Sequence, residues 1–469
     1  MPACIETYAA ALEFLYGRIN YERVQAEAYS TSDFKLERMR VLLSLIGSPH
    51  ERIPAIHVAG TKGKGSTCAM LAAVLTAAGH RTGLYISPHI SAFEERMTVD
   101  GVQPSPDEFI AILNRLLPTI AHMDALPGQM QPTYFELATA IAWLYFQDGQ
   151  ADFAVLETGL GGRLDSTNVC RPLVTVITNV SRDHTLILGS TVRQIAWEKA
   201  GIIKPGIPVI SGVSHVDAIE IVDQTARARG SSLSLFDREI RVTARHRHEG
   251  ALNDEAARAV VAARTTVDVQ TARSTWRDIP VALRGVHQAT NAALALAAID
   301  ELRAQGVSIS DAAVSQGMSR VRWPGRVEVA ALQPIVVIDA AHNWESARAL
   351  IATLREEFRP RRRLLIFAAT RDKDVSGLLR LLVPQFDTII FTKYLDNPRG
   401  VSPSELLSFV RSISNREAHS TETPAEAWRL AQHWVGQDDL IAITGSLFLV
   451  AELRSLVLAT VGSRQEQTH

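Results

Sequence analysis

Short runs of apolar residues alternate with longer amphipathic stretches along most of the chain. In the first 320 residues the apolar runs predict strands at 56–59, 82–86, 152–156, 173–178 and 208–211. Apolar positions at helical spacing predict helices at 5–19, 34–46, 67–78, 106–117, 133–147, 192–200 and 288–305. Strands that alternate with helices indicate a parallel, doubly wound α/β sheet with helices on its faces.

A second α/β pattern begins after residues 321–326, where Pro324-Gly325 interrupts the chain. Its predicted strands are 335–338, 364–368, 388–392 and 440–443. Its predicted helices are 344–357, 375–382, 403–412 and 424–436. We therefore expect two domains, at 1–320 and 321–469.

The stretch 55–67, AIHVAGTKGKGST, combines a strand, a glycine-rich turn and the start of a helix. Glycines let backbone N–H groups approach a phosphate, and the helix N-terminus adds a favourable dipole. Lys64 would neutralise the β- and γ-phosphates, and Ser66 or Thr67 would offer a hydroxyl to Mg²⁺. The fit to G-x-x-x-x-G-K-[ST] is imperfect, because Val58 replaces the first glycine and Gly65 follows the lysine. The stretch predicts a nucleotide-binding loop rather than an ordinary βα turn.

Polar side chains follow three further predicted strands, namely Ser87, Glu157 and His184. The carboxyl ends of parallel strands meet at one edge of a sheet, where ligands bind. A hydroxyl, a carboxylate and an imidazole beside a triphosphate loop predict an Mg²⁺ site. The second domain has polar segments at its strand ends but no phosphate loop, which suggests a lid or co-binding domain.

Composition removes several classes of function. The formal net charge is −2, so there is no electrostatic case for nucleic acid or an anionic membrane as partner. The three cysteines are scattered, which is typical of a reducing compartment. The N-terminus lacks a basic region ahead of an apolar run, and no apolar run reaches membrane-spanning length. We expect a cytoplasmic protein with small-molecule substrates.

Several motifs, in order, resemble the folylpolyglutamate synthase/dihydrofolate synthase family of the Mur ligase superfamily. They are Gly60-Thr-Lys-Gly-Lys-Gly-Ser66, Glu157-Thr-Gly-Leu-Gly-Gly-Arg-Leu-Asp165, Thr178-Asn-Val-x-x-Asp-His184, Glu198-Lys-Ala-Gly-Ile202, His287-Gln-x-x-Asn291, Pro324-Gly-Arg326 and Asp339-x-Ala-His-Asn343. The resemblance implies a P-loop domain of the Mur ligase central type that carries the folate-site loops. It also implies a smaller Rossmann-like domain that closes over ATP and binds glutamate.

The resemblance further implies a reaction. ATP would phosphorylate the carboxylate of dihydropteroate, of a reduced folate, or of both. The amine of L-glutamate would attack the acyl phosphate, and ADP and phosphate would leave. Such chemistry needs cations on the phosphate oxygens, an aligned carboxylate and a pocket that excludes water.

Individual residues acquire roles through the same resemblance. Lys64, Lys199 and His184 would be catalytic. The nucleotide would contact Gly63, Lys64, Gly65, Ser66, Asn291, Arg326, Asp339 and His342. Two Mg²⁺ ions would be held by Ser87, Glu157, His184 and Lys199, the last as a carbamate, and a monovalent cation is a further candidate. The folate would meet Asp33, Phe34, Lys35, Leu36, Thr133, Tyr134, Phe135, Glu136, Leu164, Asp165 and Ser166. Family analogy also implies a monomer.

Two departures and two alternatives stay open at this point. Trp197, where a polar or basic residue is expected, and the variable segment 34–35 leave the preferred folate undetermined. A Mur-type ligase acting on another carboxylate acceptor would need a substrate domain before the phosphate loop, and only about fifty residues precede it. A P-loop nucleotide-binding module would be expected to show an Asn-Lys-x-Asp segment, which the sequence lacks.

Overall fold

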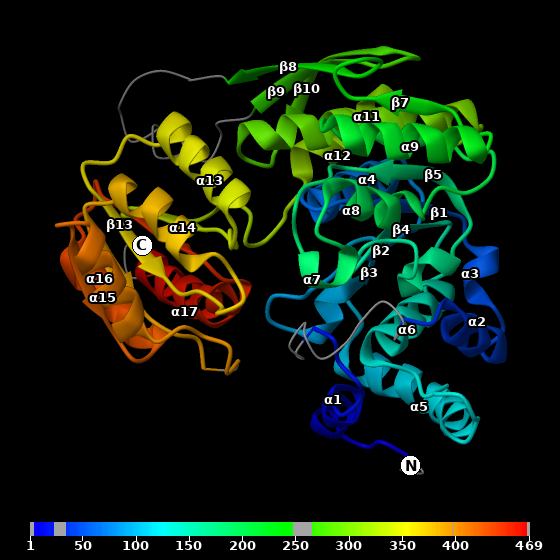
Figure 1. Cartoon of the computed structure of the whole chain (residues 1–469), viewed down its shortest axis with the longest axis horizontal. Helices are drawn as coiled ribbons and strands as arrows, with labels where there is room; N and C mark the ends of the chain where they lie inside the picture. The colour runs from blue at the N-terminus through cyan, green and yellow to red at the C-terminus, as the bar shows by residue number, and fades with distance from the viewer. Residues whose placement is uncertain (1–3, 23–33, 247–264, 396, 467–469) are drawn as a thin grey trace. The chain divides into compact units, whose positions relative to one another are not determined.

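The computed structural model describes residues 4–22, 34–246, 265–395 and 397–466 (Figure 1). The chain divides into two compact units, and each is described separately below. The first comprises Met1–Thr243, Val267–Pro280 and Ala289–Val321, and the second Ala244–Thr266, Val281–Gln288 and Arg322–His469. The last division lies between Val321 and Arg322, and two short earlier pieces group with the second unit.

The first unit is built on a seven-stranded sheet of order β3-β2-β4-β1-β5-β6-β7. The strands are β1 Ala55–Ala59, β2 Thr82–Tyr85, β3 Met97–Val99, β4 Phe153–Glu157, β5 Pro172–Ile177, β6 Val209–Ser211 and β7 Leu233–Leu235. All neighbours are parallel except β3, which pairs antiparallel with β2 at one edge. Every residue of β1 is buried, as expected for a central parallel strand. The predicted doubly wound α/β sheet is confirmed.

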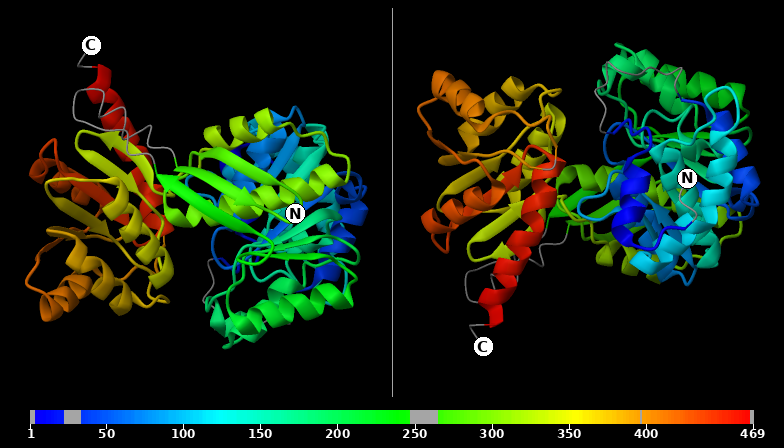
Figure 2. Two further views of the ribbon diagram at one scale, coloured as in Figure 1. Left: turned by 90° about the horizontal axis from the view of Figure 1, so that it is seen from above. Right: turned by 90° about the horizontal axis from the view of Figure 1, so that it is seen from below.

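Helices cover both faces of this sheet, as Figure 2 shows. They are α1 Tyr8–Tyr16, α2 Leu36–Leu45, α3 Pro49–Arg52, α4 Lys64–Ala77, α5 Pro106–Asp124, α6 Tyr134–Asp148, α7 Thr185–Leu188, α8 Val192–Ala200, α9 Val216–Ala228, α11 Val286–Ala304 and α12 Asp311–Arg320, with short 3₁₀ helices η3 Phe93–Arg96 and η4 Ser166–Val169. One apolar core lies under α1, α2, α5 and α6, and a second lies under α8 and α9. Ala55 in the first core and Ala59 in the second point to the same face of β1, so both cores lie on one face of the sheet.

A third sheet has three strands in the order β10-β9-β8. Its strands are β8 Arg241–His246, β9 Thr265–Gln270 and β10 Thr275–Val281. Asp300 of α11 accepts hydrogen bonds from Thr271 Oγ1 at 2.5 Å and Ser274 Oγ at 2.7 Å, in the turn between β9 and β10. The buried carboxylate therefore fixes α11 to this sheet.

The second unit contains a six-stranded sheet of order β11-β12-β16-β13-β14-β15, in which only β11 is antiparallel to its neighbour. Its strands are β11 Glu328–Leu332, β12 Ile335–Ile338, β13 Arg363–Phe367, β14 Thr388–Phe391, β15 Glu417–Ser420 and β16 Leu440–Thr444. Its helices are α13 Trp344–Glu357, α14 Val375–Leu382, α15 Pro403–Ile413, α16 Pro424–Trp434 and α17 Leu447–Glu466, with the 3₁₀ helix η5 Val383–Gln385. Every helix among the described residues is either too short or too polar to span a lipid bilayer.

Candidate active site

The phosphate loop leaves β1 at Gly60 and enters α4 at Lys64. Gly63 has a φ of +80°, and a Cβ there would lie 2.4 Å from Oδ1 of Asn291 on α11. Gly63, where this left-handed conformation favours a residue without a Cβ, is the N-cap, and α4 begins at Lys64 and not at Thr67 as the apolar pattern predicts. The first turn, with Lys64, Gly65 and Ser66, therefore directs backbone N–H groups towards the start of the helix, which favours an anion.

The end of β5 holds this loop in shape. Asn179 Oδ1 accepts hydrogen bonds from the backbone N–H groups of Thr61 at 3.1 Å and Lys62 at 2.8 Å. Thr178 Oγ1 donates to the Lys62 carbonyl at 2.6 Å. Lys62 Nζ lies 2.7 Å from Asp183 Oδ2. The motif 178–184 thus holds the phosphate loop 60–66 through hydrogen bonds and an ion pair, an arrangement called the Asn179 clamp below. The partnership of Lys62 and Asp183 was missed from sequence, although a second lysine in the loop and an acidic residue beside His184 were signals for it.

Three of the predicted site residues meet at the ends of β1, β2 and β4. Glu157, the last residue of β4, is buried, and its Oε1 lies 3.7 Å from Lys64 Nζ. Its Oε2 accepts a hydrogen bond from the backbone N–H of Ser87 at 3.3 Å. A carboxylate, a serine and a phosphate-loop lysine are therefore adjacent.

This donor set fits Mg²⁺. Magnesium in nucleotide sites is bound by one or two carboxylates together with phosphate oxygens and water, so it needs no cage of protein ligands. No cluster of three or more His, Cys, Asp or Glu side chains suited to a metal occurs among the residues that the structure describes. Glu157 and Ser87 would supply hard oxygen ligands beside the phosphates.

Lys199, near the C-terminus of α8, contacts the same loop. The residue is 4% exposed, and its Nζ donates to the Gly60 carbonyl at 2.9 Å. Burial, together with the neighbouring charge of Lys64, lowers the pKa of Lys199 to about 7. Much of the amine is therefore neutral near pH 7, which is the form that reacts with CO₂. Sequence alone would describe Lys199 as a solvated helix lysine.

His184 occupies the rim of this region. It takes a left-handed conformation with a φ of +50° and is the N-cap of α7. Its side chain is 49% exposed, and its Nε2 lies 3.9 Å from Asp183 Oδ1. The Lys62–Asp183 pair thus links His184 to the phosphate loop. An exposed imidazole at this place is accessible to a ligand.

The segments predicted to meet the folate come together on the α6 side of the sheet. Phe135 packs so closely on Gly159 that a Cβ at this glycine would lie 2.4 Å from the ring. Ser166 Oγ lies 2.6 Å from Thr139 Oγ1, and Thr139 also donates to Tyr85 OH at 3.3 Å. Segments 133–136 and 164–166 are therefore neighbours.

Several of these predicted contact residues form hydrogen bonds that stabilise the fold locally. Thr133 and Glu136 form the capping box of α6, and Glu136 also accepts from Arg38 Nε at 2.7 Å. Asp165 accepts four hydrogen bonds, from the N–H groups of Gly159, Leu160 and Thr167 and from the Thr167 hydroxyl. Burial raises the pKa of Asp165. These carboxylates shape the walls of the region.

The remaining predicted folate residues lie around α2 and the loop after β4. The Phe34 ring centroid is 5.0 Å from that of Tyr21, and Lys35 Nζ donates to the Gly128 carbonyl at 2.9 Å. Leu36 is the first residue of α2 and is partly buried, as is Leu164, while Tyr134 is 1% exposed. Asp33 lies outside the described residues.

Trp197 acquires a structural explanation. It is 52% exposed, and the guanidinium of Arg163 lies over its ring at 4.4 Å. Arg163 also pairs with Glu198 Oε1 at 2.9 Å. The tryptophan therefore helps to hold the signature loop 157–165 on α8.

In the second unit, Asp339 follows β12 and is buried. Its two oxygens accept hydrogen bonds from the N–H groups of Val327 at 2.9 Å and Ala341 at 2.8 Å. Burial raises the pKa of Asp339, while the nearby Arg326 acts in the opposite direction. His342 Nδ1 lies 2.9 Å from the Ala340 carbonyl. Arg326, Asp339 and His342 thus belong to one edge of this sheet.

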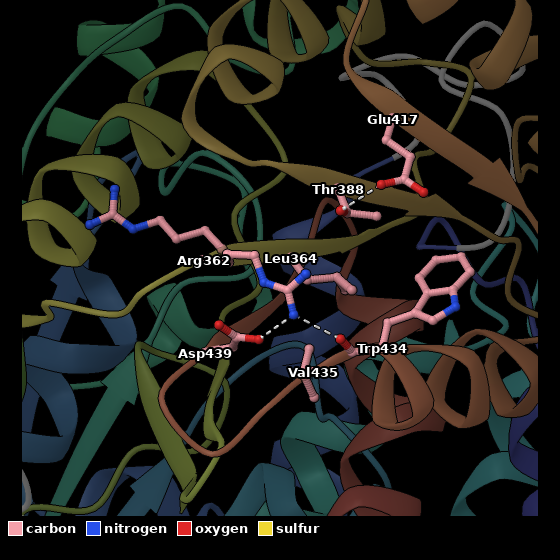
Figure 3. A pocket seen from close by; sticks show the side chains of 8 residues that line it. Arg362, Leu364, Thr388, Glu417, Trp434, Val435 and Asp439 are labelled. Atoms are coloured by element: carbon pink, nitrogen blue, oxygen red, sulfur yellow. Dashed lines mark hydrogen bonds and ion pairs between the residues drawn. The ribbon is translucent and has the colours of Figure 1, made fainter.

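A cavity of about 180 Å³ lies in the second unit at the other edge of the sheet (Figure 3). It is lined by Arg363, Thr388 and Glu417, which are the first residues of β13, β14 and β15. Ligands of parallel α/β sheets bind at the carboxyl ends of the strands. This cavity is therefore separate from the predicted nucleotide-contacting edge.

Comparisons with known proteins agree with this arrangement. The Mur ligase middle domain profile matches residues 58–299, and the Mur ligase glutamate ligase domain profile matches residues 325–447. The chain is 36% identical over 422 residues to dihydrofolate synthase/folylpolyglutamate synthase of Bacillus subtilis, covering 89% of this chain and 94% of that protein.

Two solved structures are similar over nearly the whole length. Folylpolyglutamate synthase of Mycobacterium tuberculosis, solved with ADP and AMPPCP, has a TM-score of 0.83 at 31% identity and covers 96% of this chain and 99% of that chain. Escherichia coli FolC, solved with DHPP and ADP, has a TM-score of 0.81 at 28% identity and covers 98% and 100%, respectively.

Proposed function

This chain belongs to the dihydrofolate synthase/folylpolyglutamate synthase family of Mur ligases, and we propose that it is an ATP-dependent ligase that adds L-glutamate to dihydropteroate, to reduced folates, or to both. The observation that carries the proposal is the joint placement of Lys64, Glu157 and Ser87 beside the buried Lys199 at one sheet edge. The ADP complexes of related synthases support nucleotide use by this chain.

In the proposed reaction, the γ-phosphoryl group of ATP passes to the acceptor carboxylate, and the resulting acyl phosphate is attacked by the amine of glutamate. Mg²⁺, when bound there, would neutralise charge on the phosphates. Lys64 and the N–H groups at the start of α4 orient the same phosphates. Glu157 and Ser87 would hold the metal, and the Asn179 clamp would keep the loop in its binding shape without prior rearrangement.

We also propose that Lys199 is carbamylated and that His184 contributes to a second Mg²⁺ site. The lowered pKa of Lys199 makes its amine nucleophilic near neutral pH. The cations of Lys62 and Lys64 would stabilise the carbamate anion. The modification converts a buried cation into an anion with two oxygens, which is a suitable magnesium ligand.

The acceptor would lie along the neighbouring segments 133–136 and 164–166, with aromatic surface from Phe135. Asn291, packed on Gly63, would contact the nucleotide from the first unit. Arg326, Asp339 and His342 would contribute the second unit's contacts to ATP, and this unit would bind glutamate. These assignments are supported by the shared motifs and by the preformed edge of the second sheet.

The direct test is phosphate release by the purified protein with Mg-ATP and L-glutamate. 7,8-Dihydropteroate and tetrahydrofolate are supplied in separate reactions, and the products are identified by mass spectrometry. A glutamate adduct of either acceptor supports the proposal and identifies which step the enzyme performs. Phosphate release with neither acceptor, from folded protein that binds ATP, would contradict it and favour a ligase for another carboxylate.

A further inference from the structure

Arg96, the last residue of η3, joins three separate segments of the first unit from a fully buried position. Its two terminal nitrogens donate to Glu22, NH1 to Oε1 at 2.9 Å and NH2 to Oε2 at 2.6 Å. Its Nε donates to His89 Nδ1 at 2.8 Å. The guanidinium also lies over the Tyr134 ring at 5.2 Å. One side chain therefore connects the chain before α2, the loop after β2 and the start of α6.

The backbone of Arg96 adds a fourth connection. Its carbonyl accepts a hydrogen bond from the N–H of Ile86 at 2.9 Å, immediately before Ser87. The side chain holds His89, two residues after Ser87. A single residue thus fixes both sides of Ser87-Pro88, while Ser87 itself donates its N–H to Glu157. The placement of the Ser87 hydroxyl beside the phosphate loop depends on this bracket.

Burial makes the arrangement sensitive to its counter-charge. A guanidinium without solvent contact requires a paired carboxylate, and Glu22 provides it with two parallel hydrogen bonds. Acceptance by His89 Nδ1 requires that this nitrogen be unprotonated, so the His89 proton resides on Nε2. Arg96 thereby selects one neutral tautomer of His89.

We propose that Arg96 is a positioning residue for the magnesium–nucleotide site, which holds Ser87 from both sides and depends on Glu22 for charge balance. The inference rests on the proposed function, because Ser87 receives its role as a metal ligand there. Arg96 does not touch the nucleotide; it acts through Ser87 and His89. Displacement of a ligand by about 1 Å is enough to cost a large factor in a preorganised site.

The test separates positioning from folding with a double substitution. Arg96→Met combined with Glu22→Gln removes both charges, so no buried charge is left unpaired and the protein should keep its melting temperature within a few degrees. Binding of the ATP analogue AMPPCP is then measured by calorimetry while Mg²⁺ is titrated. The expected result is at least a tenfold rise in the Mg²⁺ concentration needed for half-maximal binding, with metal-free nucleotide affinity unchanged.

A matched control exists at the C-terminal end of α5, where Asp124 is the last residue. Arg18 and Asp124 also form a two-bond pair, at 2.8 and 3.0 Å, and Arg18 lies over the Phe14 ring at 4.9 Å. Arg18→Met with Asp124→Asn should leave the Mg²⁺ requirement unchanged. The same rise in this control, or a wild-type Mg²⁺ requirement in the Arg96→Met/Glu22→Gln protein, overturns the proposal.

Two further measurements cover the case in which the double variant does not fold. Arg96→Lys keeps the charge but lacks the fork that bonds Glu22 and His89 together, so it should also raise the Mg²⁺ requirement. Nitrogen NMR of His89 should show a single Nε2–H tautomer in the wild type and a mixture in Arg96→Lys. A wild-type result in both measurements overturns the proposal. Because these are binding and spectroscopic readouts, they are distinguishable from a failure to ligate glutamate to a folate.

Discussion

Lys199 offers the most quantitative prediction. With a pKa of about 7, half of its amine is neutral at pH 7, compared with roughly one part in 3,000 for an ordinary lysine of pKa 10.5. CO₂ reacts with the neutral amine only. Carbamylation of Lys199 should therefore exceed that of an exposed lysine by a factor on the order of 10³ at this pH.

The sign of the pH dependence follows from the same shift. At fixed bicarbonate above neutral pH, dissolved CO₂ falls as the proton concentration falls, and this cancels the proton released by carbamate formation. Carbamate occupancy then follows the neutral fraction of the amine. Occupancy at Lys199 should rise about twofold from pH 7 to 8 and then level off, whereas an ordinary lysine gains about tenfold per pH unit up to its own pKa.

The assay is ¹³C NMR of the protein equilibrated with ¹³C-bicarbonate, with mass spectrometry to locate the added mass. Lys199→Met should remove the signal, and Lys393→Met, which changes a partly exposed lysine of the second unit, should keep it. Lys64→Met removes one cause of the lowered Lys199 pKa, so the rise in carbamate occupancy should shift to higher pH. A signal that survives in Lys199→Met, or one that keeps rising tenfold per pH unit to pH 9, would refute the reasoning.

Three further predictions concern the loop and its supports. Lys64→Ala should abolish turnover by removing a phosphate contact. Near-normal phosphate release in this variant would contradict the assignment of this loop as the nucleotide-binding site. Gly63→Ala should weaken ATP binding at least tenfold in calorimetry, since a Cβ would strain a φ of +80° and meet Asn291 at 2.4 Å; unchanged affinity would contradict the geometry. Glu136→Gln leaves the buried Arg38 without its carboxylate and should cost about 3–5 kcal/mol in urea unfolding, whereas Arg38→Met/Glu136→Gln should cost much less; equal losses would argue against the ion pair.

The sequence predicts those parts of the fold that local patterns determine. The central strands are continuous apolar runs, so β1, β4, β5 and β12 were placed within a residue or two. The polar residues that follow them had to meet at one edge, as Glu157 and Ser87 do beside Lys64. The short edge strands β3 and β15 were missed, because Met97–Val99 and Glu417–Ser420 contain no apolar run.

Contacts between residues far apart in the chain could not be predicted from local sequence patterns. Arg96 and Glu22 are 74 positions apart, and Arg38 and Glu136 are 98 apart, so no local spacing connects them. The start of α4 depends on the left-handed Gly63 and not on apolar periodicity. The lowered pKa of Lys199 arises from burial, which the amphipathic pattern of 192–200 does not reveal. The roles of Ser87, His184, Asn291 and the folate residues stay predictions.

The central claim is ligation through an acyl phosphate, and one isotope experiment tests it most directly. 7,8-Dihydropteroate labelled with ¹⁸O in its carboxylate is incubated with the enzyme, Mg-ATP and L-glutamate, and the released phosphate is analysed by mass spectrometry. The account predicts ADP, a glutamate amide and phosphate that carries one ¹⁸O atom from the acceptor. If the amide forms but its phosphate carries no label, or AMP and pyrophosphate are released, the proposed chemistry is wrong.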